Sequence, residues 1–244
     1  MSDDIKIDLL VNSQISQSDK FINFKIILVG ESGVGKREIL NRAVQNKFDG
    51  NYQATIGFEF LLMYFKVNEL KIKLQIWDTC GQEMYRSLVQ GFYRNTSLAI
   101  MVYDINKRKT FDNLESWIKD IRQNTEIDLP IFIVGNNSHL EREVQLEEAK
   151  VFAVSNRVIY FTECSAKTGD NVKEIFFEAA KCLYKTYKEF GLKYKLSPPG
   201  RLKINDKKSK KFFSKKSLKE ENNDTIYPKE KNYNIMPLLK YINY

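Results

Sequence analysis

The chain has 244 residues, 43% of them hydrophobic, which is enough for one domain of ordinary size with extensions at its ends. Three irregularly spaced cysteines, Cys80, Cys164 and Cys182, exclude a disulfide framework and indicate a reducing compartment. Residues 191–244 hold 14 of the 39 basic and 5 of the 31 acidic side chains, so they carry the whole net charge of +8 and the rest is nearly neutral. This distribution argues against a nucleic-acid-binding body, and the lack of long apolar runs excludes a signal peptide and a membrane span.

From residue 24 onward, short apolar runs alternate with helical patterns. Strands are predicted at 24–29, 58–67, 71–77, 98–103, 130–134 and 158–163, and helices at 36–46, 111–123, 144–154 and 171–190. Asn68 and Glu69 form the turn of a hairpin between the second and third strands. The pattern predicts an α/β domain with a six-stranded, mostly parallel sheet, one antiparallel edge strand and helices on both faces. In such sheets, ligands bind beyond the carboxyl ends of the strands.

Three regions follow from this pattern. Residues 1–20 form an N-terminal extension in which we find no readable signal, and residues 21–190 form the domain. Residues 191–244 are a basic segment rich in Lys, Ser and Asn, which we expect to be disordered.

A glycine-rich loop follows the first predicted strand and precedes the first helix. Its residues are Gly30, Glu31, Ser32, Gly33, Val34, Gly35 and Lys36. The spacing is that of a phosphate-binding P-loop, in which glycines let backbone N–H groups turn toward a phosphate and Lys reaches the outer phosphates. The alternative is a structural glycine turn that binds no ligand.

The residue after this lysine departs from the motif. The motif has Ser or Thr there, whose hydroxyl ligates Mg²⁺, but this chain has Arg37. A guanidinium cannot ligate a cation and repels one, so we expect weakened Mg²⁺ binding.

Further segments make the chain from about residue 24 to 187 resemble the Rab branch of the Ras-like small GTPases. These are residues 55–60 (TIGFEF), 73–83 (KLQIWDTCGQE), 93–94 (YR), 102–105 (VYDI) and 163–167 (ECSAK). The resemblance implies the Ras-like P-loop NTPase fold, binding of GTP or GDP and slow GTP hydrolysis. It implies that Thr55 and Asp78 hold Mg²⁺, that the Gly81 amide meets the γ-phosphate, that Gln82 orients the attacking water and that Phe48 stacks on the base.

The loop that reads the base in this family also departs from the pattern. The family has Asn-Lys-x-Asp, whereas this chain has Asn136, Asn137, Ser138 and His139. Asn136 could still tie this loop to the P-loop, and Ser165, Ala166 and Lys167 fit the last nucleotide-contacting loop. His139 lacks the two acceptors of a carboxylate, a loss that weakens guanine binding on the order of 10²- to 10⁴-fold. It could equally be an ordinary solvated side chain.

The basic segment 207–216 carries Phe212 and Phe213 at its centre. It could bind an anionic membrane surface, remain a solvated tail or act in nuclear import or nucleic-acid contact. The last cysteine is Cys182, within a predicted helix, so we expect no prenyl anchor.

Two hypotheses for function remain. The first is a Rab-like guanine-nucleotide switch in vesicle trafficking, cytoplasmic or peripheral on endomembranes. It is a monomer that presents residues 55–60 and 81–94 to effector proteins and binds no specific nucleic acid. The second is a pseudo-GTPase interaction module with weak or altered nucleotide binding, which Arg37 and His139 favour.

Overall fold

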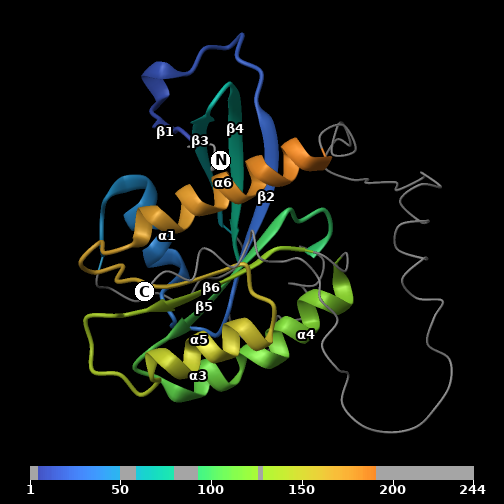
Figure 1. The fold of residues 1–244 in the computed structure, drawn as a ribbon. Coiled ribbons are helices and arrows are strands. Elements are labelled where there is room, and N and C mark those ends of the chain that lie inside the picture. Colours follow the sequence, from blue (N-terminus) through green and yellow to red (C-terminus); the bar gives the residue numbers. More distant parts are fainter. Residues whose placement is uncertain (1–4, 50–58, 80–92, 126–128, 191–244) are drawn as a thin grey trace, which may run out of the picture.

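One sheet organises the protein. The computed structural model describes residues 5–49, 59–79, 93–125 and 129–190, and within them seven strands follow the order β1-β3-β4-β2-β5-β6-β7 (Figure 1). The strands are β1 (Ile7–Leu10), β2 (Ile22–Val29), β3 (Glu59–Val67), β4 (Leu70–Asp78), β5 (Leu98–Asp104), β6 (Ile131–Asn136) and β7 (Tyr160–Glu163). From β4 to β7 the pairing is parallel, whereas β1 and β3 are antiparallel to their neighbours. The predicted α/β class and mixed sheet are confirmed.

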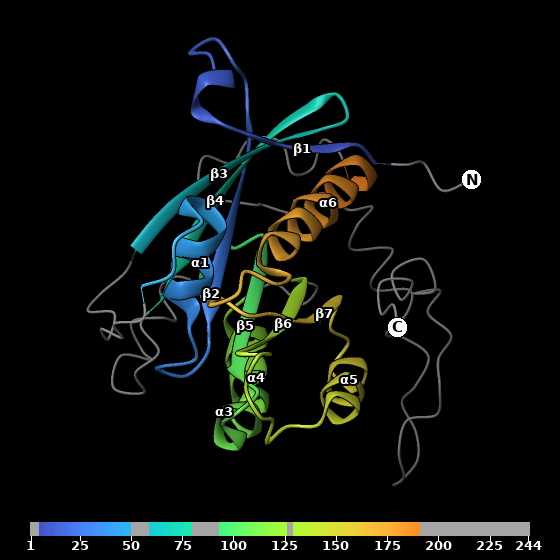
Figure 2. The same ribbon diagram turned by 90° about the vertical axis from the view of Figure 1, so that its left-hand side faces the viewer.

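Helices cover both faces of the sheet. They are α1 (Lys36–Gln45), α3 (Arg108–Asp112), α4 (Leu114–Asn124), α5 (Leu146–Ser155) and α6 (Val172–Phe190), with a short 3-10 helix η1 (Asn12–Gln14). One apolar cluster joins α1 and α6 to one face, and a second joins α3, α4 and α5 to the other (Figures 1 and 2). Neighbouring residues of β2 alternate between them, Ile26 in the first and Ile27 in the second, because successive strand side chains point to opposite faces.

The central strands end where the candidate site begins. In β2 the last four residues are fully buried, and all seven residues of β5 are buried. Such strands read as continuous apolar runs because helices cover both of their faces. The loops that follow β2 and β6 therefore begin at buried strand ends.

The prediction of six strands was wrong by one, because the N-terminal extension supplies β1. This strand pairs with the second half of β3, from Ile7 opposite Val67 to Leu10 opposite Tyr64. As a result β3, predicted as the edge, is covered along that half. The short apolar pairs between polar residues in this extension gave no strand signal. The partner strand β3, which makes the segment a strand, lies more than fifty residues further along the chain.

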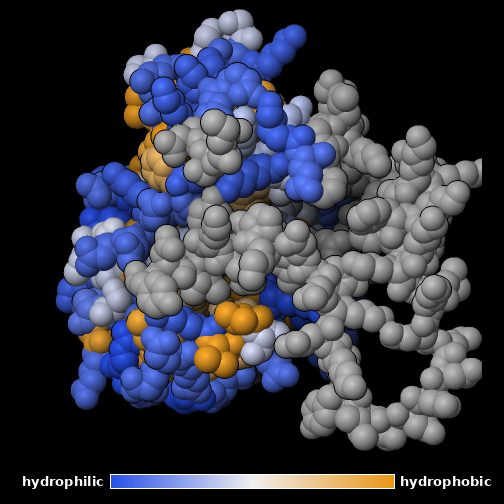
Figure 3. Space-filling model, viewed as in Figure 1, coloured by the Kyte–Doolittle hydropathy of each residue, from blue (hydrophilic) through white to orange (hydrophobic). Residues whose placement is uncertain are grey.

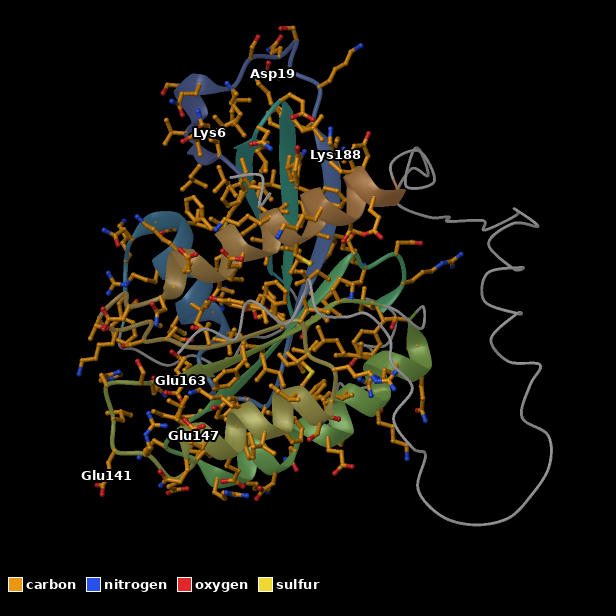
Figure 4. The ribbon with its side chains drawn as sticks, viewed as in Figure 1. Lys6, Asp19, Glu141, Glu147, Glu163 and Lys188 are labelled. Atoms are coloured by element: carbon orange, nitrogen blue, oxygen red, sulfur yellow. The ribbon has the colours of Figure 1, made fainter. Side chains whose placement is uncertain are left out.

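The extension is held at several points. Asn68, in the β3–β4 turn with φ of 51°, donates its backbone N–H to the Lys6 carbonyl (2.9 Å), and its side chain accepts from the Lys6 N–H (2.9 Å). Asp19 pairs with Lys71 at 2.6 Å. Figure 4 shows Lys6, Asp19 and Lys188 gathered around this end of the sheet, and Figure 2 shows β1 running past α6.

The surface is mostly hydrophilic in Figure 3, with an apolar patch over α5. Val151 and Val154 of this helix are 65% and 51% exposed. No helix among the described residues has both the length and the apolarity needed to cross a bilayer.

Candidate functional site

The glycine-rich loop connects β2 to α1 and closes tightly. Gly30, Gly33 and Gly35 have φ values of 137°, 79° and 89°, which side chains rarely tolerate. A Cβ on Gly30 would lie 2.1 Å from the Val102 carbonyl oxygen, and one on Gly35 would lie 2.1 Å from Asn136 Nδ2. The loop conformation therefore requires glycine for both dihedral and steric reasons, and it leaves α1 with its N-terminal amides at the mouth of the loop.

Lys36 places a cation inside the loop. It is the first residue of α1 and only 7% exposed, and its ammonium donates to the carbonyls of Gly30 (2.8 Å) and Glu31 (2.9 Å). The positive charge and the N-terminus of α1 thus act at the same place. This arrangement fits a phosphate group, because both features favour an anion.

Asp78 brings a buried carboxylate to the same mouth. It ends β4 directly beside Leu28 of β2, is fully buried, and its two oxygens have no hydrogen-bond partner among the described residues. Burial raises the pKa of Asp78 to about 6, and the charges of Lys36 and then Arg37 oppose the rise. A buried carboxylate without a donor calls for a cation beside it.

The residues present fit Mg²⁺ only in part. The Asp78 carboxylate is a suitable hard ligand, but Arg37, the second residue of α1, is not one. The charges of Lys36 and, to a smaller extent, Arg37 lower the pKa of Asp78 against the effect of burial, so this carboxylate already lies in the field of two cations of the chain. No group of three or more His, Cys, Asp or Glu that could hold a metal occurs in the described part of the chain. Thr55, the other expected metal ligand, lies outside the described residues.

Asn136 ties three loops together. Located at the end of β6 and 1% exposed, it donates from Nδ2 to the Val34 carbonyl (2.9 Å) in the glycine-rich loop. Its Oδ1 accepts from the backbone N–H of Ala166 (3.1 Å) in the loop after β7. The expected tie between Asn136 and the P-loop is therefore present, and it extends to a third loop.

His139 contacts that third loop. The residue is exposed, but its Nδ1 lies 2.9 Å from the hydroxyl of the fully buried Ser165. This hydroxyl also accepts from the Thr168 N–H (3.1 Å), so its own proton is available to His139. His139 is thus exposed, as an ordinary surface side chain would be, but it is hydrogen-bonded to the loop predicted to contact the nucleotide.

Arg42 supports the same loop and was missed at the sequence level. From α1 it donates to the carbonyls of Ala166 (2.8 Å) and Lys167 (2.6 Å). Glu31 likewise links the glycine-rich loop to α4 by accepting from Trp117 Nε1 (3.1 Å). Neither partner could be identified from the sequence, because each contact joins segments more than eighty residues apart.

The remaining predicted residues lie at the rim or outside the described ranges. Ser32 and Lys167 are exposed, and Phe48 is 38% exposed beyond the end of α1. Gly81 and Gln82, like Thr55, lie outside the described residues. The structure thus brings together the glycine-rich loop, Asp78, Asn136 and the Ser165 loop.

A mostly parallel sheet with a glycine-rich, lysine-containing loop between β2 and the N-terminus of α1 is typical of P-loop nucleotide-binding proteins. The family model described as the Ras family matches residues 25–185. Ras-related protein RABA1c of Arabidopsis thaliana is 42% identical over 157 residues, which cover 64% of this chain and 72% of that protein. The chain therefore belongs to the Ras family. It is a Rab-like GTP-binding switch of vesicle trafficking, and proteins of this family bind GTP or GDP with Mg²⁺ and act through effector proteins.

Proposed function

We propose that this switch binds guanine nucleotides at the loop of residues 30–36 and hydrolyses GTP slowly. It binds Mg²⁺ and recognises the guanine base more weakly than is usual in its family. The observation that supports the site is the convergence of Lys36, the α1 N-terminus and Asn136 on one glycine-rich loop. In this proposal the loop amides and Lys36 hold the phosphates, and Gln82 orients the attacking water.

The identity of the bound nucleotide tests this proposal. Freshly purified full-length protein is denatured, and the released nucleotide is separated by ion-exchange chromatography and quantified. We expect guanine nucleotide, mainly GDP, near one equivalent per chain. Protein that releases no nucleotide, or adenine nucleotide, would instead support the pseudo-GTPase alternative.

Hydrolysis is tested by single-turnover kinetics of GTP loaded on the protein. Gln82→Leu should slow the step at least 10-fold, because the water loses its orienting group. Gln123→Leu on the exposed side of α4 is the matched control and should leave the rate unchanged. Equal rates in all three proteins would remove Gln82 from the mechanism.

We also propose that His139 weakens guanine binding. Its Nδ1 faces the Ser165 hydroxyl, and an imidazole offers at most one acceptor where a carboxylate offers two oxygens. Calorimetric titration of GDP into the wild-type protein and into His139→Asp measures this effect.

The regions outside the core carry further proposals. We place the domain at residues 21–190. The protein is a monomer and contacts effectors through residues 55–60 and 81–94.

The basic segment 207–216 contacts anionic membrane surfaces, since each Lys near such a surface contributes about 1 kcal/mol to binding. Sedimentation with vesicles containing 30% phosphatidylserine, compared with neutral vesicles, tests the last point. Equal sedimentation with both would refute it.

A further inference from the structure

A polyphosphate bound at the glycine-rich loop would lie near the negative charge of Asp78, and a cation of the chain itself could offset the repulsion between them. Asp78 presents a fully buried carboxylate whose oxygens have no hydrogen-bond partner among the described residues. A bound polyphosphate would add several negative charges next to it. Two groups of like charge in a desolvated site repel strongly, so a cation must stand between them.

Lys36 is occupied elsewhere in the loop. Its ammonium donates to the carbonyls of Gly30 and Glu31 and lies within the cradle that would receive the phosphates. Its charge acts on Asp78 more strongly than that of Arg37, but two loop carbonyls hold the ammonium within the cradle. The remaining repulsion would be offset by a further cation beside the carboxylate, from a source other than Lys36.

Arg37 is positioned to be that source. It follows Lys36 in the first turn of α1, at the mouth of the glycine-rich loop, and is half-buried. Its guanidinium stays charged at any physiological pH and can donate to a carboxylate and a phosphate from different edges of its planar fork. It also occupies the position whose side chain, in the P-loop motif, would ligate the metal.

We propose that the Arg37 guanidinium takes the place of the divalent cation, bridging Asp78 and the terminal phosphates, so that the nucleotide is bound without metal. This inference rests on the proposed nucleotide site. The alternative is that Arg37 turns away when nucleotide enters and a metal ion binds Asp78 in the usual manner. In that case the affinity remains metal-dependent.

Nucleotide release measures the difference. Full-length protein is stripped of nucleotide, loaded with N-methylanthraniloyl-GDP and followed by fluorescence in 5 mM MgCl₂ or 5 mM EDTA. We expect dissociation rates within about 3-fold of each other in the two buffers. Release accelerated more than 10-fold by EDTA would overturn the role of Arg37 while leaving nucleotide binding intact. Failure to load in either buffer would overturn the proposed function together with this inference.

Variants of Arg37 separate the effect of its charge from the effect of its shape. Arg37→Ser supplies the hydroxyl and removes the charge, so its release should become at least 10-fold faster in EDTA than in Mg²⁺. Arg37→Lys keeps the charge without the fork and should remain insensitive to EDTA while releasing nucleotide faster than wild type. Arg122→Ser, on α4 and covering the opposite face of the sheet, is the matched control and should behave as wild type. Identical EDTA sensitivity in wild type and Arg37→Ser would contradict the proposal.

Direct metal binding gives a second readout that does not depend on release or turnover. Mn²⁺ is titrated into the GDP-loaded protein and free Mn²⁺ is monitored by electron paramagnetic resonance. We expect no tight site in wild type and about one per chain in Arg37→Ser. A tight Mn²⁺ site in the wild-type complex would refute the substitution of metal by Arg37.

Discussion

Replacing Asp78 by Asn should stabilise the protein in the absence of nucleotide. Burial raises the pKa of this carboxyl from 3.8 to about 6, although Lys36 and Arg37 pull it down. The difference of about 2 units corresponds to about 3 kcal/mol by which the charged carboxylate disfavours the folded state at neutral pH. The neutral amide removes this penalty, but its own polar atoms remain without partners, so we expect a net gain of about 1–3 kcal/mol.

The pH dependence identifies the cause of this gain. Because the folded-state pKa is raised, the folded protein binds more protons than the unfolded chain between about pH 4 and 6. Wild-type stability therefore falls as the pH rises through this window and stays low above it. The difference between Asp78→Asn and wild type should be largest at pH 7 and shrink toward pH 4.

Urea unfolding of nucleotide-free protein, followed by circular dichroism at several pH values, measures the difference. The matched control is Asp104→Asn, at an equally buried carboxylate that accepts from the Asn106 N–H (3.0 Å) and pairs with Lys107 (3.3 Å). That variant should be destabilised because it loses a partnered charge. A pH-independent difference at Asp78, or a loss of stability at pH 7, would refute the reasoning.

Three further predictions follow from the site and the extension. Asn136→Ala should lower the free energy of unfolding by roughly 1–3 kcal/mol for each of the two backbone groups that it leaves buried and unpaired. It should also accelerate the release of a fluorescent GDP analogue. Urea unfolding identical to that of the wild type would refute the prediction. Deleting residues 1–11 should lower the free energy of unfolding by on the order of 3 kcal/mol, because it removes β1 and the packing of its apolar side chains on the core. Thermal unfolding measures the change. An unchanged midpoint temperature would show that the strand contributes nothing to stability. His139→Asp should tighten GDP binding by on the order of 10²-fold or more in calorimetry, whereas unchanged affinity would mean that residue 139 does not read the base.

The added strand changes which edge the sheet exposes. Exposed strand edges are available for pairing with other chains, and β1 covers the C-terminal half of β3. The half from Glu59 to Met63 pairs only with β4 among the described strands. The extension therefore confines the open edge of β3 to the end next to the predicted effector segment.

Local patterns were sufficient for much of the fold. Largely apolar runs predicted β2, β5 and β6, because helices cover both faces of these strands and most of their residues are buried. The glycines of the P-loop could be recognised from spacing alone, because positive φ angles and close backbone approach leave no other residue type. A single helix predicted at 111–123 is instead α3 and α4, which meet at Asn113.

The chemistry available at each position of the site can thus be read from the amino-acid order: a cradle of glycines, one lysine, an arginine where a hydroxyl is usual and a histidine where a carboxylate is usual. Which of these groups meet depends on the folded arrangement. It left Asp78 buried without a hydrogen-bond donor among the described residues and placed Asn136 between the Val34 carbonyl and the Ala166 amide. Such contacts join segments that are distant in the chain, and only the packing of helices on the sheet brings them within hydrogen-bond range.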